Sequence, residues 1–560
     1  MLAIRIMYRY MRRSRLAAYL LLSTIVVNLL GLAVPMYSIQ LLNRYISIGL
    51  TPTLITLTLG AIIAIIFEVL LRRQRQKLLI SVGNEIDQSY SQRVLSIFSR
   101  TRFDALSATD TAIKREALSA PSTMQQLGSV NNLGTLLDIP FSLLYLAMAW
   151  SLSPLFGAFG AVACILALLL GWRAERSQRE YAEQQSQAGS RAQQLQQFLL
   201  SHGEALRALP MIGTFSKRWT AAQGESLTAR RGATGIQGNM QSTVQSSGQA
   251  LTVAVYSFGA LAAVQGDLTT GALIGGNILV ARAFAICSRG AYLADPALKA
   301  QRAEGSLVSL EAQEREVERG LKPNALQGKL LVHDASFTYP KGQVPIFERL
   351  NFSSAAGQVV VIKGENGTGK TTLIKTMLGL LALQRGVVQA DGLEVKQFDQ
   401  SWWREHTGYA PQEPILFDAT LKENLVLDRS VEDERVMELI REMGLESFIA
   451  QDPDGLERIV SSNEATMAVG QRRRLALIRA VIGNPQAIFL DDPTEGLDQP
   501  GMLAVAKLLN RLVSENRTLV VASNEPFILK AADVVVNMNS KPEPSVETVQ
   551  RAKSEDVTNV

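Results

Sequence analysis

Long apolar runs alternate with polar stretches through the first 300 residues of the chain. A helix needs about 20 consecutive apolar residues to cross a bilayer. Runs near that length occur at about 16–40, 54–71, 133–151, 154–172, 245–265 and 270–290. The pattern therefore predicts six membrane-spanning helices.

Two long polar connections interrupt this series, at about 72–132 and 173–244. Both are rich in Gln, Glu, Arg and Ser and contain almost no proline, so turn signals are few. We expect helices that continue the spans for tens of ångströms, at a rise of about 1.5 Å per residue. Two separate soluble insertions are the alternative, which the matching lengths and the lack of turn signals disfavour.

The long connections begin with basic residues, whereas the short loops between the other spans carry little charge. The basic residues are Arg72, Arg73, Arg75, Lys77, Arg173 and Arg176. The short loops contain only Arg44 and Asp267. Because Lys and Arg next to spans favour the cytoplasmic side, this distribution places both termini and both long connections in the cytoplasm.

Polar residues within the spans are a second feature of this region. Asp138 and Pro140 lie in the third span, and Asn277 and Arg282 lie in the sixth. An intramembrane charge is costly and usually faces a cavity or an ionic partner. Two interpretations stay open: Arg282 faces a pathway or pairs with Asp138, or both side chains lie near the interfaces and extend toward water.

The pattern changes at about residue 328 to short β-type runs that alternate with helical stretches, which indicates an α/β domain. We therefore expect a membrane domain over 1–300, a linker over 301–327 and the α/β domain over 328–540. The segment 541–560 has little apolar content, which is typical of a disordered tail.

Composition agrees with a membrane protein of more than one domain. Of the 560 residues, 47% are hydrophobic and only 19% are charged. The net charge of +5 is modest, and the basic residues stand beside apolar runs, so nucleic-acid binding is not expected. The two cysteines, Cys164 and Cys287, lie in apolar segments and predict neither a disulfide framework nor a metal site.

Residues 364–371 read Gly-Glu-Asn-Gly-Thr-Gly-Lys-Thr and follow the apolar run Val359–Ile362. A strand that leads through a glycine-rich turn into a helix lets backbone N–H groups converge on a polyphosphate. Lys370 would reach the terminal phosphates, and the Thr371 hydroxyl would contact Mg²⁺. The sequence therefore predicts a nucleoside triphosphate site.

Further motifs follow in the order found in ATP-binding cassette (ABC) domains, which nearly all of 328–540 resembles. The resemblance implies ATP and Mg²⁺ as cofactors. It implies nucleotide contacts from Tyr339, Gly364, Glu365, Asn366, Gly367, Thr368, Gly369, Lys370, Thr371, Thr372, Ala468, Gly470 and Gln471. It also implies a metal shell of Thr371, Gln412 and Asp491, and catalytic roles for Asp492, Gln412 and Asn524.

Three positions depart from the pattern of that family. The signature, usually Leu-Ser-Gly-Gly-Gln, reads Met-Ala-Val-Gly-Gln at 467–471, so Ala468 lacks the hydroxyl that would donate to a phosphate. Asp492 replaces the usual catalytic glutamate and is one methylene shorter, and Asn524 replaces the switch histidine. A misplaced base can cost on the order of 10²-fold in rate. We therefore expect ATP to be bound well and hydrolysed slowly.

Six spans ahead of one cassette resemble an ABC half-transporter of the exporter type. Because such cassettes bind ATP between two copies, a homodimer or a heterodimer with a second half-transporter is implied.

Stretches at 29–37, 132–141 and 271–279 are similar to type I secretion permease–ATPases. This likeness implies a polypeptide substrate, a periplasmic adaptor, an outer-membrane channel and a place in the inner membrane, without leader-peptide processing. A non-transporting regulatory or scaffold subunit and a lipid or drug exporter are the alternatives.

Overall fold

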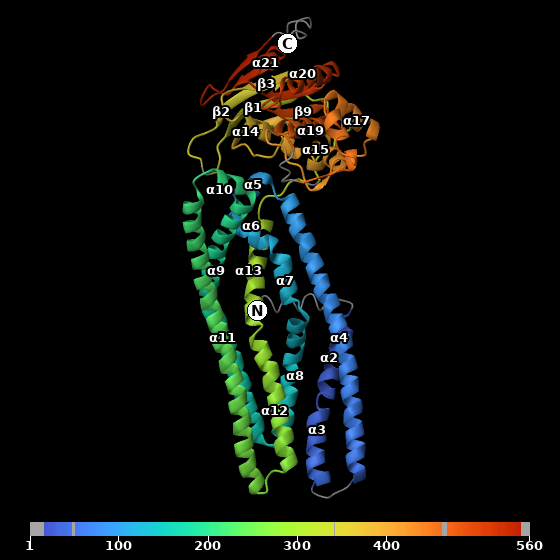
Figure 1. Cartoon of the computed structure of the whole chain (residues 1–560), viewed down its shortest axis with the longest axis vertical. Helices are drawn as coiled ribbons and strands as arrows, with labels where there is room; N and C mark the ends of the chain where they lie inside the picture. Colours follow the sequence, from blue (N-terminus) through green and yellow to red (C-terminus); the bar gives the residue numbers. More distant parts are fainter. Residues whose placement is uncertain (1–15, 47–50, 318, 341, 462–466, 550–560) are drawn as a thin grey trace. The chain divides into compact units, whose positions relative to one another are not determined.

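The computed structural model describes residues 16–46, 51–317, 319–340, 342–461 and 467–549, and these form two compact units. The first unit contains the chain up to Ser99 together with Thr109–Ala312. The second contains Arg100–Ala108 and the chain from Gln313 onward. Figure 1 shows helices throughout the first unit and strands in the second.

Six helical stretches of the first unit are long and apolar enough to cross a membrane within the described residues, as predicted. They are Ala17–Ile46, Thr51–Arg100 (α4), Val130–Leu152 (α8), Pro154–Ala174 in α9, Ile212–Val264 (α11) and Thr270–Glu311. The first comprises α2 (Ala17–Leu30), α3 (Ala33–Gln40) and a π-helix (Leu41–Ile46), and the last comprises α12 (Thr270–Ala291) and α13 (Ala294–Glu311). Helix α8 continues through Pro140.

The long polar connections are largely helical extensions, which confirms that expectation. Helix α9 runs from Pro154 to Ser201 and packs along α11 for much of its length (Figure 1). The first connection is less regular, because after α4 it contains the short helices α5 (Phe103–Ala108), α6 (Thr111–Leu118) and α7 (Ala120–Leu127). The second contains one short helix, α10 (Gly203–Ala208).

Apolar side chains from α8, α9, α11 and α12 form the core of the first unit. Tyr145, Phe156 and Leu279 are almost completely buried there. Gly276 lets α12 approach α9 closely, since a Cβ at this position would lie 2.5 Å from the Phe156 ring.

The buried charges do not pair as one interpretation of the sequence proposed. Asp138 binds Arg75 of α4 through two contacts, Oδ1–Nη1 at 2.7 Å and Oδ2–Nη2 at 3.2 Å, and Asn28 Nδ2 donates to it at 3.0 Å. The pairing of Arg282 with Asp138 is therefore wrong. Asp138 pairs with Arg75 and Arg282 pairs with Glu68, and the hypothesis had considered neither partner.

Arg282 binds Glu68, whose carboxylate lies 3.1 Å away and also pairs with Arg72. Arg282 Nη1 donates to the Gly31 carbonyl at 2.5 Å, at the turn between α2 and α3. A Cβ at position 31 would lie 2.6 Å from Arg282 Nη2 and from the Tyr145 hydroxyl, so a larger residue there would displace the ends of both side chains. These contacts connect α2, α4 and α12 within one buried polar network.

The second unit contains two main sheets. A four-stranded antiparallel sheet has the order β2-β1-β4-β5, from β1 (Leu330–Phe337), β2 (Phe347–Ser354), β4 (Arg385–Ala390) and β5 (Leu393–Glu394). A six-stranded sheet has the order β12-β11-β3-β10-β9-β6, from β3 (Val359–Lys363), β6 (Thr407–Ala410), β9 (Ala487–Asp491), β10 (Thr518–Ala522), β11 (Val534–Asn537) and β12 (Ser545–Thr548). The α/β organisation expected from 328 onward is present.

Strands β3, β9 and β10 pair in parallel and are buried on both faces, which explains their continuous apolar sequences. Helices cover the faces: α14 (Lys370–Met377), α15 (Gln400–His406), α16 (Leu421–Val426), α17 (Asp433–Glu442), α18 (Glu446–Ala450), α19 (Val469–Val481), α20 (Gln499–Ser514) and α21 (Pro526–Lys530). A two-stranded ribbon joins β7 (Ala419–Thr420) to β8 (Ile459–Val460).

The expectation of a disordered tail from residue 541 is wrong for its first part. Residues Ser545–Thr548 form β12, which pairs antiparallel with β11 at the edge of the six-stranded sheet. An edge strand offers unpaired backbone groups, so a polar segment can add a strand without contributing apolar side chains. Residues 550–560 lie outside the described part of the chain.

Candidate functional site

The glycine-rich loop at 364–371 joins the carboxyl end of β3 to the start of α14, as the sequence predicts. Gly367 and Gly369 have φ values of +83° and +106°. A Cβ at Gly369 would lie 2.2 Å from Ile346, so both the backbone conformation and the space require glycine there. The loop therefore turns tightly enough to direct backbone N–H groups at an anion above the N-terminus of α14.

Lys370 is buried at the first position of α14. Its Nζ donates to the Gly364 carbonyl at 2.7 Å and lies 4.0 Å from Asp492 Oδ2. The ammonium group is thus held over the loop, where it can meet the terminal phosphates of a nucleotide. Thr372 follows on the same helix, and its hydroxyl lies 3.0 Å from the hydroxyl of Tyr339.

Tyr339 is 43% exposed and packs edge-on against Phe337, with ring centroids 5.0 Å apart. An exposed ring beside the phosphate-binding loop can stack on a base, so this geometry is compatible with the predicted adenine contact.

Asp491 is the last residue of β9, and its carboxylate is suited to bind a divalent cation. Its side chain is buried, and within the described residues neither carboxylate oxygen has a hydrogen-bond partner. Burial raises the pKa of Asp491, while the nearby Thr371 hydroxyl acts in the opposite direction. A buried carboxylate without partners is unfavourable unless a cation neutralises it, and Mg²⁺ prefers carboxylate, hydroxyl and phosphate oxygens. Asp491 and Thr371 would hold such an ion.

Asp492 follows in the left-handed backbone region, with φ at +46°, and its N–H donates to the Ala522 carbonyl at 3.0 Å. This conformation places its carboxylate toward Lys370. Burial raises the pKa of Asp492, and the positive charge of Lys370 opposes this effect. The predicted catalytic carboxylate is therefore in the site, paired with the lysine of the loop.

Asn524 is bound to the backbone of the phosphate-binding loop. Its Oδ1 accepts from the Gly364 N–H at 3.0 Å, and its Nδ2 donates to the Gly364 carbonyl at 2.9 Å. A primary amide places a donor and an acceptor side by side, which an imidazole ring cannot do. The residue at the switch position thus holds the loop, an arrangement that the sequence did not reveal.

Gln412 is part of a polar bridge that sequence reasoning missed. Its Nε2 donates to Glu495 Oε2 at 3.1 Å, and Arg473 Nη2 donates to the same oxygen at 2.8 Å. These two hydrogen bonds lower the pKa of Glu495, with the Gln412 bond the larger cause. The position of Glu495, three residues after Asp492 in the sequence, was the available signal.

The degenerate signature starts helix α19. Ala468 precedes the helix, and its N–H donates to Gln471 Oε1 at 3.1 Å, while its methyl side chain accepts nothing. Val469 is exposed, and Gly470 follows on the first turn. Among the described residues, no hydrogen bond or ion pair joins Ala468, Gly470 or Gln471 to the phosphate-binding loop of the same chain.

Comparisons with known proteins agree with this geometry. The family model described as "ABC transporter" matches residues 347–495, which include the loop, the bridge and the Asp491–Asp492 pair. The chain carries an ABC transporter ATP-binding domain. With one such domain and six apolar helical stretches among its described residues, it has the architecture of a half-transporter and is a multi-pass membrane protein.

Two curated relatives illustrate the range of similarity. The "Type I secretion system ATP-binding protein PrsD" of Rhizobium meliloti (strain 1021) is 25% identical over 92% of this chain and 88% of its own length. The "ABC transporter B family member 3" of Dictyostelium discoideum is 34% identical, but the match covers 39% of this chain and only 15% of that protein.

The fold itself is that of an ABC exporter. A solved structure of a bacterial Atm1-family ABC exporter with ATP bound superposes with a TM-score of 0.82. The match covers 94% of each chain at 17% sequence identity.

Proposed function

We propose that this chain is one subunit of an ATP-driven exporter of polypeptides in the inner membrane, with the ATP-binding domain and both termini in the cytoplasm. The observation that carries the proposal is the similarity to a type I secretion protein along almost the whole of both chains. The exporter fold supports it, since the six apolar stretches supply a pathway and the ATP-binding domain supplies the energy source.

The subunit acts as a dimer. Among the described residues of one chain, no hydrogen bond or ion pair joins the signature residues Ala468, Gly470 and Gln471 to the phosphate-binding loop, so a second ATP-binding domain would supply the opposing surface for the bound nucleotide. The loop 364–372 and Tyr339 would hold ATP, Asp491 and Thr371 would hold Mg²⁺, and Ala468, Gly470 and Gln471 would face the nucleotide on the partner. A periplasmic adaptor and an outer-membrane channel would complete the export route.

Hydrolysis at this site is slow. Asn524 is hydrogen-bonded to Gly364 through both of its polar side-chain atoms, and Gln412 is hydrogen-bonded to Glu495. These contacts fix the orientation of both amides, so either side chain would have to break them before it could turn its bonded atoms toward a water molecule. Asp492 is shorter than a glutamate and lies against Lys370.

The proposal is tested with inside-out membrane vesicles that contain the full-length protein, its Lys370→Ala variant or no added transporter. ATP-dependent, protease-protected uptake of an unfolded polypeptide by the wild type alone supports polypeptide export. Equal uptake by all three vesicle types, or ATP-dependent uptake of a lipid or drug probe without polypeptide uptake, contradicts it. Assembly with an adaptor that does not depend on ATP, without any uptake, favours a scaffold subunit.

A further inference from the structure

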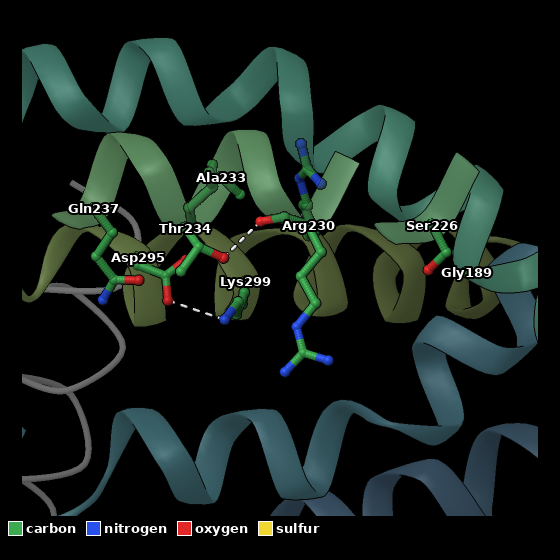
Figure 2. A pocket seen from close by; sticks show the side chains of 10 residues that line it. Gly189, Ser226, Arg230, Ala233, Thr234, Gln237, Asp295 and Lys299 are labelled. Atoms are coloured by element: carbon green, nitrogen blue, oxygen red, sulfur yellow. Dashed lines mark hydrogen bonds and ion pairs between the residues drawn. The ribbon is translucent and has the colours of Figure 1, made fainter. Parts of the chain in front are cut away.

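A polar cleft of about 550 Å³ lies between α9, α11 and α13 of the first unit (Figure 2). Its ion pair joins Lys299 Nζ to Asp295 Oδ2 at 2.9 Å, one turn apart on α13, so this contact stays within a single helix. The polar bridge formed by Gln412, Glu495 and Arg473 is different, because it joins three elements of the ATP-binding domain.

The bridge connects segments that lie far apart in the sequence. Gln412 follows β6, Glu495 follows β9, and Arg473 lies in α19. Gln412 Nε2 and Arg473 Nη2 both donate to Glu495 Oε2, at 3.1 Å and 2.8 Å. Glu495 is therefore the shared acceptor of the bridge.

Arg473 anchors the bridge. Its side chain is only 11% exposed, and its Nε and Nη1 atoms are buried without a hydrogen-bond partner among the described residues. A buried guanidinium group needs a counter-charge, since a lone buried charge is strongly destabilising. The Glu495 carboxylate supplies this counter-charge through its contact with Nη2, so Arg473 fixes Glu495 in place.

The bridge lies beside the groups that would act on the nucleotide. The Gln412 hydrogen bond lowers the pKa of Glu495, and the positive charge of Lys370 acts in the same direction. Burial raises the pKa of Asp492, and the negative charge of Glu495 adds to this effect. Glu495 is thus within electrostatic reach of both the loop lysine and Asp492.

The hydrogen bond to Glu495 fixes the orientation of the Gln412 amide. A primary amide carries its donor nitrogen and its acceptor oxygen on two arms of the same carbon, so Nε2 toward Glu495 turns Oε1 away from it. Among the described residues, Oε1 makes no hydrogen bond. Because Mg²⁺ prefers oxygen ligands, the bridge leaves the metal-binding atom of Gln412 available.

We propose that Glu495 and Arg473 are positioning residues for Mg²⁺. Arg473 holds Glu495, and Glu495 orients the Gln412 amide. The amide oxygen would then complete the metal shell of Asp491 and Thr371. The inference rests on the proposed function, because it concerns the Mg²⁺ site of that ATP-driven subunit, and it gives roles to two residues that the sequence motifs did not assign.

The test measures the affinity of the full-length protein in detergent for a radiolabelled, non-hydrolysable ATP analogue, once with EDTA and once with Mg²⁺. The ratio of the two dissociation constants is the gain that Mg²⁺ supplies. Glu495→Ala should lower this gain at least about tenfold and leave the affinity in EDTA within about twofold, because groups that orient a metal ligand contribute about 10–100-fold to metal affinity. Glu495→Gln should keep most of the gain, since its amide oxygen can still accept from both donors. Glu413→Ala is the matched control, because it removes an exposed charge next to Gln412 and should change neither affinity.

A double-mutant cycle asks whether Glu495 acts through Gln412. The gain is already reduced in Gln412→Ala, and adding Glu495→Ala should lower it no further. If Glu495→Ala prevents folding by leaving Arg473 unpaired, the double variant Arg473→Met with Glu495→Ala removes both charges and should show the same loss of gain.

An unchanged gain in Glu495→Ala, an equal loss in Glu413→Ala, or a further loss on top of Gln412→Ala overturns the proposal. An affinity that falls equally in EDTA and in Mg²⁺ shows a structural role and also overturns it. A failure of the proposed function is distinguishable, because nucleotide binding does not require a transported polypeptide. If Glu495→Ala loses the gain as expected but no vesicle takes up polypeptide, the positioning role stands and export falls.

Discussion

Replacement of Arg75 by alanine tests the buried ion pair most sharply. The change leaves Asp138 buried with only the Asn28 amide as a partner among the described residues. The Arg75 and Asp138 side chains are each only 11% exposed. Loss of one member of a buried pair costs about 3–5 kcal/mol, and the residual exposure favours the lower end, about 3 kcal/mol.

For a unit of about 300 residues, with an unfolding entropy of about 2.1 cal/mol/K per residue, about 3 kcal/mol corresponds to a fall of about 5 °C in apparent melting temperature. The assay is thermal unfolding of the full-length protein in detergent. Arg73→Ala is the matched control, because Arg73 is exposed on the same helix and should change the temperature by less than about 1 °C. The exchange Arg75→Asp with Asp138→Arg should recover most of the loss. Equal effects of Arg75→Ala and Arg73→Ala would refute the reasoning.

Three predictions concern the nucleotide site. Asp492→Glu with Asn524→His should raise phosphate release at least about tenfold, because it restores the reach of the base and frees Gly364; an unchanged rate contradicts this. Asp491→Asn should raise the melting temperature without Mg²⁺, since an unpartnered buried carboxylate costs more than the about 1–3 kcal/mol of an unpartnered neutral group, and should abolish the Mg²⁺-dependent increase. The pKa of Glu495 is lowered in the folded protein, so its contribution to stability is fully present above about pH 4.3, its unfolded pKa. This contribution is lost as the pH falls through the lower, folded value. Unfolding measured as a function of pH should show this loss in the wild type, and Glu495→Gln should remove it.

The features that could be predicted from the sequence are those that local patterns encode. The six apolar stretches and the loop at 364–371 each depend on residues close together in the chain, so their periodicity or motif was sufficient. The short helices after α4 were not predicted, since the polar sequence there contains a single proline, Pro121, and otherwise resembles one continuous helix.

The sequence alone could not show which side chains far apart in the chain pair with one another. Asp138 lies 63 residues from Arg75 and 144 from Arg282, and nothing local indicates which arginine it meets. Glu68 was overlooked because one charge hardly alters the apolar character of its span. The role of Asn524 was hidden for a similar reason: its two bonds reach Gly364, 160 residues away. Strand β12 forms because β11 presents a free edge, not because of its own composition.

The central claim is that the ATP-binding domain retains ATP and hydrolyses it slowly. The most direct measurement is to load the purified full-length protein with ATP and Mg²⁺, remove free nucleotide by rapid gel filtration, and identify the retained nucleotide by chromatography. The account predicts mainly ATP on the wild type and none on the Lys370→Ala variant. Retention of ADP alone by the wild type, or of equal amounts of ATP by Lys370→Ala, would contradict it.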